Sequence, residues 1–220
     1  MKKLVIFDLD GTLLNTIADL AAAVNYSLRQ LGINEHPQES YPFFVGNGVT
    51  RLFERALPAT LQNEEWIEKV RSHFLPYYDA HNADLTSIYP DMKNLLHALI
   101  DKKVMLAVAS NKYQSATEKL IRHYFPEIDF VCILGQRQGV PVKPDPSIVH
   151  SCIEAAKVTP EEVLYVGDSG VDMQTAANAN VQSVGVTWGF RPVAELQNNG
   201  ACYLANQPAD ILQLLVEGGK

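Results

Sequence analysis

The 220-residue sequence has few cysteines, and none of them lie close together. Three cysteines are an odd number without the short spacings of a disulfide framework or a zinc site, which favours reduced thiols; they are Cys132, Cys152 and Cys202. The histidines also lack metal-ligand spacing and are expected at the surface or in packing; they are His36, His73, His81, His97, His123 and His150. Neither residue type therefore indicates a metal centre.

Long apolar runs and basic segments are missing as well. The stretch LVIF before the first aspartate is too short for the core of a signal peptide, and no window approaches the roughly 20 apolar residues of a membrane span. The formal net charge is -7 and no segment is rich in lysine or arginine, which disfavours nucleic acid and anionic membranes as partners. We expect a cytoplasmic protein that acts on a small molecule; the sequence gives no oligomeric state.

What the sequence does contain is an alternation of apolar runs and helical patterns from residue 104 onward. The runs are typical of buried parallel strands; they are VMLAVA, DFVCIL, VLYVG and VQSVGV. The stretch LVIF near the N-terminus is a further run of the same kind. About five strands separated by helices predict an α/β fold, with a parallel, Rossmann-like sheet and helices on both faces.

A second pattern separates the first strand from the others. The segments TIADLAAAVNYSLRQLG, VTRLFERAL and NEEWIEKVRSHFLPYYDAH carry apolar residues at helical spacing, with little strand signal between them. This predicts a helical cap over residues 16–82, inserted after the first strand, and a catalytic core of residues 1–15 and 83–220.

The stretch VIFDLDGT delivers two aspartates immediately after the first strand. In an extended chain, residues two apart point to the same face, so Asp8 and Asp10 are expected side by side. Crowded carboxylates raise one another's pKa unless a cation or hydrogen-bond donors offset the repulsion. The pair therefore implies either a shared proton or a metal ion.

Other polar residues follow the later strands, and each has an ordinary explanation when taken alone. Ser110 and Asn111 are favoured helix N-caps, Lys143 in VKPDP resembles a solvated lysine, and Asp168 in GDSGVD resembles an N-cap. Together they meet at the carboxyl edge of one sheet, where open α/β sheets bind ligands. The combination indicates an active site.

This combination resembles the haloacid dehalogenase superfamily of phosphotransferases. The matching residues fall into four motifs: Asp8, Asp10 and Thr12; Ser110; Lys143; Asp168 and Asp172. Within the superfamily, LLNTIADL, VGNG and VGDSGVD are similar to the phosphoglycolate phosphatase-like group. Two departures, Asn15 in place of a usual aspartate and Asn180 in place of a usual glycine, bear on the subgroup rather than on the reaction.

The resemblance implies a magnesium-dependent phosphatase. Asp8, Asp168 and the backbone carbonyl of Asp10 would hold Mg²⁺. Asp8 would attack phosphorus to form an aspartyl phosphate, and Asp10 would act as general acid and base. Four residues would bind the phosphoryl oxygens, namely Thr12, Ser110, Asn111 and Lys143. Asp172 would support the metal waters or Lys143.

In the cap, the segment VGNGVTR is the candidate for contact with the rest of the substrate. It contains Gly46, Asn47, Gly48 and Arg51. A small anionic substrate such as phosphoglycolate would make use of Arg51, although a Gly-x-Gly is usually a turn and an arginine on a helix is usually solvated.

Three alternatives remain open at this point. Pyrophosphate, nucleotides or sugar phosphates are other substrates for a capped phosphatase. A β-phosphoglucomutase-like phosphomutase would share the two aspartates, but such mutases carry a histidine on the helix after the first motif, where this chain has Leu20. A phosphoacceptor receiver domain, which is not an enzyme, is typically little more than half this length and uninterrupted.

Overall fold

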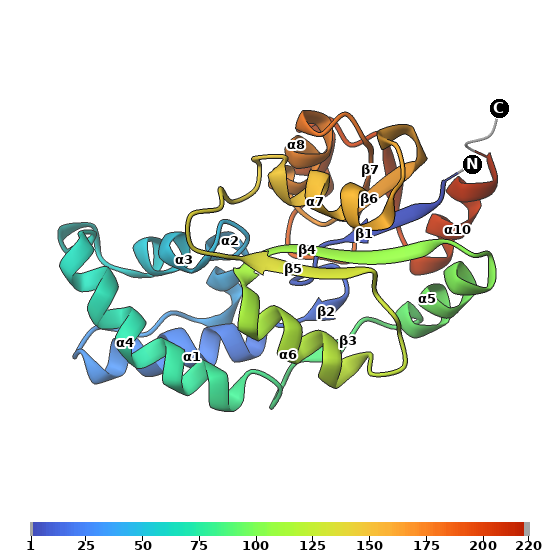
Figure 1. The fold of residues 1–220 in the computed structure, drawn as a ribbon. Helices are drawn as coiled ribbons and strands as arrows, with labels where there is room; N and C mark the ends of the chain where they lie inside the picture. The colour runs from blue at the N-terminus through green and yellow to red at the C-terminus, as the bar shows by residue number, and fades with distance from the viewer. Residues whose placement is uncertain (1, 218–220) are drawn as a thin grey trace.

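Six parallel strands form the central sheet of a computed structural model that describes residues 2–217 (Figure 1). Their order is β5-β4-β1-β6-β7-β8, so β1 lies between β4 and β6. The bounds are β1 Leu4–Phe7, β4 Met105–Tyr113, β5 Cys132–Gln136, β6 Val163–Gly167, β7 Gln182–Val186 and β8 Tyr203–Ala205. The predicted parallel sheet is confirmed. The sequence analysis missed β8 because three residues are too few for a periodic pattern.

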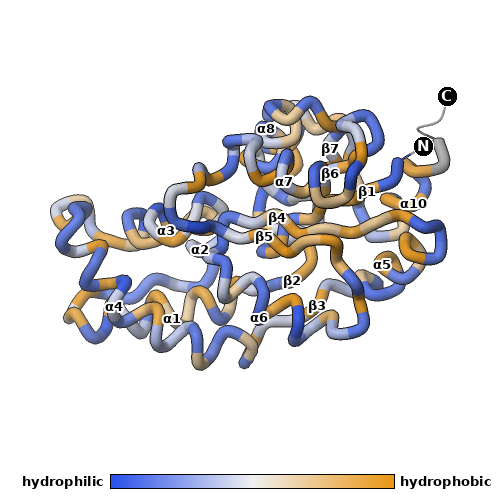
Figure 2. The backbone as a smooth tube through the Cα atoms, in the orientation of Figure 1, coloured by the Kyte–Doolittle hydropathy of each residue, from blue (hydrophilic) through white to orange (hydrophobic). Residues whose placement is uncertain are grey.

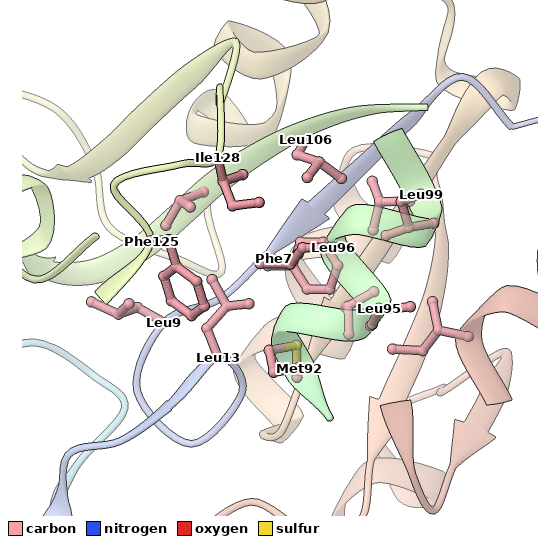
Figure 3. Close-up of a cluster of buried hydrophobic side chains, with 14 of the residues drawn as sticks. Phe7, Leu9, Leu13, Met92, Leu95, Leu96, Leu99, Leu106, Phe125 and Ile128 are labelled. Carbon is pink, nitrogen blue, oxygen red and sulfur yellow. The ribbon is translucent and has the colours of Figure 1, made fainter. Parts of the chain in front are cut away.

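Helices cover both faces of this sheet, because alternate residues of each strand point to opposite sides. Val5 and Phe7 pack in one apolar cluster with α5 (Met92–Asp101), α6 (Gln114–Tyr124) and α10 (Pro208–Glu217), as Figure 3 shows in part. Leu4 and Ile6 pack on the other face against α7 (Ser147–Ala156) and α8 (Gly170–Asn178). A short helix, α9 (Val193–Asn198), follows β7. Burial on both faces explains the uninterrupted apolar strands, which Figure 2 shows within the molecule.

A separate group of helices lies at one end of the molecule (Figure 1, left). It consists of α1 (Ile17–Gln30), α2 (Tyr41–Phe44), α3 (Val49–Ala56) and α4 (Glu64–His81), with short 3₁₀ turns at Gln38–Ser40 and Ala59–Leu61. Another 3₁₀ turn, Pro160–Glu162, belongs to the core and precedes β6. We call these four helices the cap. Their apolar side chains form a second cluster, in which Phe53 and Phe74 are fully buried and which Ala116 of α6 joins from the core. This cluster supports the division into a cap of residues 16–82 and a core, which we keep as a proposal.

Two short strands mark the places where the chain leaves the core and returns to it. They are β2 (Leu14–Asn15) and β3 (Ser87–Ile88), and they pair antiparallel. The buried carboxylate of Asp19, on α1, accepts hydrogen bonds from the Leu85 amide and from both the amide and the hydroxyl of Thr86, the last two at 2.8 and 2.7 Å. One side chain thus ties both chain crossings together.

We expect Asp19→Asn to lower the free energy of unfolding by about 1.5–3 kcal/mol, the range for hydrogen bonds to a charged group. The asparagine amide has one acceptor oxygen, and its NH₂ group would face donors. Urea unfolding measures the change. Asp84→Asn is the matched control, because Asp84 is exposed and its carboxylate contacts the ring of the neighbouring His81. Equal unfolding midpoints for the two variants would contradict the role of Asp19.

None of the helices within residues 2–217 combines the length and the apolar character needed to cross a membrane.

Candidate active site

The candidate site lies at the carboxyl end of β1, where the chain connections run to opposite sides of the sheet. This position is the ligand-binding crevice of open α/β sheets. Asp8 follows β1 directly and is held by its amide, which donates to the Val166 carbonyl of β6 at 2.9 Å. Gly11, at a φ of +83°, turns the chain beneath Asp168, where a Cβ would lie 2.3 Å from Asp168 Oδ2. Only glycine allows the two loops to approach this closely.

Three buried carboxylates gather beside this turn. Asp8, Asp168 and Asp172 each offer an oxygen, and these atoms lie within 4.8 Å of one another. Burial, and then the charges of Asp172 and Asp10, raise the pKa of Asp8 to about 6 against the pull of Lys143. Burial, Asp172 and Asp8 raise the pKa of Asp168 well above its usual value. The cluster is therefore short of positive charge.

Lys143 supplies part of that charge. Its Nζ lies 2.7 Å from Asp172 Oδ1 and 3.0 Å from Asp8 Oδ1, and it also donates to Tyr165 and to the Ala109 carbonyl, each at 3.1 Å. Burial alone would lower the pKa of Lys143, but the two carboxylates outweigh it and raise that pKa well above the usual value. One ammonium faces three carboxylates, so negative charge remains.

A divalent cation with oxygen ligands fits this arrangement. Among the described residues, Asp8 Oδ1 is buried without a hydrogen-bond partner, although Lys143 lies at ion-pair distance. Asp172 differs: its Oδ1 accepts from Lys143 and its Oδ2 from the Ser169 amide and hydroxyl. Asp168 is intermediate: its Oδ2 accepts from the Phe190 amide at 2.7 Å, and its Oδ1 lies 3.5 Å from the Thr12 hydroxyl. Asp8 and the Oδ1 of Asp168 therefore have more capacity to bind Mg²⁺, and Asp172 is better placed to orient Lys143.

The carboxylate of Asp10 has a different environment, which the sequence analysis did not anticipate. Lys112 Nζ lies 3.0 Å from each of its two oxygens, and the Thr16 hydroxyl donates to Oδ1 at 2.7 Å. Of these two carboxylates, Asp172 raises the pKa of Asp8 more than Asp10 does. Lys112 lies two residues after Ser110, and because β4 extends to Tyr113 the two side chains share one face of the strand.

Comparisons with known proteins identify the chain. The sequence profile of the haloacid dehalogenase-like hydrolases matches residues 5–186. The chain belongs to this family. It is 33% identical to a phosphoglycolate phosphatase of Pasteurella multocida, with 88% of this chain and 90% of the relative covered. It is 35% identical to a phosphoglycolate phosphatase of Pseudomonas putida, over 88% of this chain and 73% of the relative.

Solved structures agree with this assignment. A protein from Lactobacillus delbrueckii subsp. bulgaricus has a TM-score of 0.91 at 32% identity, covering 98% of this chain and 99% of that one. A predicted phosphoglycolate phosphatase from Haemophilus somnus has a TM-score of 0.88 at 26% identity, covering 97% and 98%. The expected resemblance to phosphoglycolate phosphatase-like haloacid dehalogenases is confirmed, and so is the expectation of an enzyme rather than a receiver domain.

In this haloacid dehalogenase-like hydrolase, the second motif differs from its simplest interpretation. Ser110 and Asn111 do not cap a helix, because β4 continues to Tyr113 and α6 begins at Gln114. The pairing with β5 shifts register between Ala109 and Tyr113, an irregularity of the kind that turns side chains toward a site. The hydroxyl of Ser110 is buried and borders the cavity described below.

The Asn111 side chain is occupied by backbone groups. Its Oδ1 accepts from the Lys143 amide at 2.8 Å, and its Nδ2 donates to the carbonyls of Gly46 and Lys143 at 3.1 and 3.2 Å. This geometry favours a positioning role over the predicted contact of the side chain with phosphate. Thr12 is fully buried, and its hydroxyl is 3.5 Å from Asp168 Oδ1.

A narrow cavity of about 30 Å³ lies between cap and core, with room for about two water molecules. At the core end it is bordered by Asp8, Asp10, Ser110 and Lys112, and Gly46 and Gly48 border it from the cap. Its apolar wall comes from the cap and consists mainly of Leu20, Val45, Val49, Leu52 and Phe74. The cap therefore forms the apolar side of a cleft that reaches Asp8 and Asp10.

The two predicted cap ligands lie outside this cavity. Arg51 pairs with Glu54 at 2.5 Å, and 64% of its side chain is exposed. Asn47 Oδ1 accepts from Arg55 at 2.8 Å. Both line an open groove that shares Gly48 with this cavity and reaches Val142 and Lys143. The structure does not bring either side chain to Asp8, because the N-terminal part of α3 faces this groove.

Proposed function

We propose that the protein is a magnesium-dependent phosphatase that hydrolyses a small phosphate monoester, most favourably phosphoglycolate, through an aspartyl phosphate on Asp8. The observation that carries the proposal is the clustering of Asp8, Asp168 and Asp172 within 4.8 Å at the end of β1, with Lys143 against two of them. The names of the two curated relatives support phosphoglycolate as the substrate.

In the first half-reaction, a carboxylate oxygen of Asp8 forms a bond to phosphorus while the bond from phosphorus to the alcohol oxygen breaks. For this step Asp10 must carry a proton, so one of its oxygens must turn from Lys112 Nζ; it gives that proton to the departing oxygen, and a neutral alcohol leaves. Asp10 borders the same cavity as Asp8, which supports the action of both groups on one substrate. Lys143 and the hydroxyl of Ser110 hold the phosphoryl oxygens.

In the second half-reaction, Asp10 accepts a proton from a water molecule, and the water oxygen forms a bond to phosphorus. The bond between phosphorus and Asp8 breaks, which releases phosphate and restores the carboxylate. Asp8 and Asp168 would hold Mg²⁺, which when bound neutralises charge on the carboxylates and the phosphoryl group. Lys143 keeps its positive charge throughout, because its carboxylate neighbours stabilise the ammonium.

The lining of the cavity supports hydrolysis over transfer of the phosphoryl group to a sugar. Leu20 borders the cavity at the place where β-phosphoglucomutase-like mutases carry a histidine, and an aliphatic side chain cannot exchange protons with a sugar hydroxyl. Pyrophosphate, nucleotides and sugar phosphates remain the competing substrates for assay.

A panel of phosphorylated metabolites, assayed for phosphate release with Mg²⁺, tests the proposal. We expect phosphoglycolate to give a kcat/KM at least about tenfold above that for pyrophosphate, nucleotides and hexose phosphates, a difference of about 1.4 kcal/mol in transition-state binding. A higher value for another compound would replace the substrate and leave the phosphatase assignment in place. Phosphate release from none of the compounds would contradict the assignment itself.

A further inference from the structure

Lys112 is a buried cation that the proposed mechanism does not use. It lies near the end of β4, is 6% exposed, and borders the cavity. Its ammonium has three N–H donors, and the two oxygens of Asp10 at 3.0 Å account for two of them. No third acceptor contacts Nζ among residues 2–217, and the ring of Tyr78 lies over it with its centroid 4.9 Å away. One N–H of the ammonium therefore has no acceptor among these residues, and both Lys112 and the ring beside it border the cavity.

The other basic groups near the cap are engaged elsewhere. Lys143 Nζ is surrounded by Asp8, Asp172, Tyr165 and the Ala109 carbonyl. Arg55 donates to the carbonyls of Phe43 and Phe44, and Arg191 donates to the carbonyl of Val45. Of the described residues that border the cavity, Lys112 alone is basic.

We propose that Lys112 is the residue that selects substrates with an anionic group on the alcohol side, such as a carboxylate. The inference rests on the proposed function, because it takes Asp10 as the group that meets the leaving oxygen. Lys112 lies against that same carboxylate, so an anion one or two carbon atoms from the leaving oxygen falls beside the ammonium. A carboxylate enclosed by the apolar wall would lose its hydration and needs such a partner.

The first measurement uses the wild-type enzyme and two compounds of nearly equal size, phosphoglycolate and its carboxamide analogue. We expect kcat/KM for the carboxylate to exceed that for the carboxamide by about tenfold to a hundredfold, the value of one charge-assisted contact. A wild-type enzyme without this preference, or with the opposite one, overturns the inference. Release of phosphate from neither compound contradicts the proposed function as well.

The second measurement repeats the comparison with Lys112→Met, which keeps an unbranched side chain and removes the charge. The preference should disappear, and Lys112→Arg should restore part of it. Equal losses on both compounds would mean that Lys112 acts through Asp10 alone, which overturns the inference and leaves the proposed function untouched. Circular dichroism tests whether the variant folds, because removal of the lysine charge leaves the Asp10 carboxylate without its ion-pair partner. If Lys112→Met does not fold, the test is made with Lys112→Gln and with the wild-type preference for the carboxylate over the carboxamide.

Two control variants separate Lys112 from charge in general. Lys102→Met removes the same charge from an exposed position just before β4 begins, at the end of the strand away from the site. This variant should change the preference for the carboxylate by less than about twofold. Arg51→Met tests the residue that the sequence analysis favoured. A loss of preference in Arg51→Met with an unchanged preference in Lys112→Met would assign the role to Arg51 and overturn the inference.

Discussion

Asp8→Asn should reduce phosphate release by at least about ten-thousand-fold, because the amide cannot act as the nucleophile. The side chain keeps its size, so the fold should remain. Asp8 lies at the centre of the buried cluster, with Asp168 and Asp172 within 4.8 Å, and no other carboxylate of the cluster follows β1 directly. Single-turnover phosphate release with Mg²⁺ measures the loss.

Two further variants and one labelling experiment test whether Asp8 is the nucleophile. Asp101→Asn is the matched control, since Asp101 is exposed at the end of α5 and should leave activity unchanged. Asp10→Asn should permit only slow formation of the intermediate, because the amide cannot protonate the leaving oxygen. Mass spectrometry of enzyme quenched during turnover should find phosphate on the peptide that contains Asp8. A phosphorylated serine or histidine instead would refute the mechanism.

Removal of divalent metal should abolish phosphate release, and added Mg²⁺ should restore it. The physical reason is the charge of the cluster: burial and neighbouring carboxylates raise the pKa values of Asp8 and Asp168, which reflects the cost of ionising them without a cation. Dialysis against a chelator followed by titration with Mg²⁺ measures the effect. Full activity in excess chelator would rule out the metal assignment.

Thermal unfolding gives a second measurement that does not depend on turnover. A ligand that binds only the folded state at one hundred times its Kd adds about 2.7 kcal/mol to the free energy of unfolding, so Mg²⁺ should raise Tm in the absence of substrate. Asp168→Asn should weaken this response, whereas Asp101→Asn should leave it intact. An equal response in both variants would place the ion at another site.

The positions of the acidic residues were predictable because they follow from strand ends. β1 and β6 are short, fully buried apolar runs, and Asp8 and Asp168 come next in the chain. Lys112 was missed because Ser110 and Asn111 suggested that the strand ended before them. The register shift within β4 keeps the chain extended to Tyr113, and a sequence does not show such an irregularity.

The cap was harder to read from sequence for a related reason. Apolar spacing predicts which face of a helix is buried, as with Phe53 on α3, but it does not say what lies opposite the polar face. Arg51 was favoured for its charge and its place after VGNG. In the structure, that face borders an open groove and Arg51 pairs with Glu54.

The central place of β1 also bears on how the protein is made. Leu4 pairs with Met105 on one side and with Val163 on the other, so the first strand has no partner until much of the chain has left the ribosome. Contacts between residues so distant in sequence form slowly, because a long loop must close first. The two carboxylates that cluster with Asp8, those of Asp168 and Asp172, are synthesised at least 160 residues after it. The reactive centre therefore assembles late, and a truncated nascent chain carries the aspartate without its site.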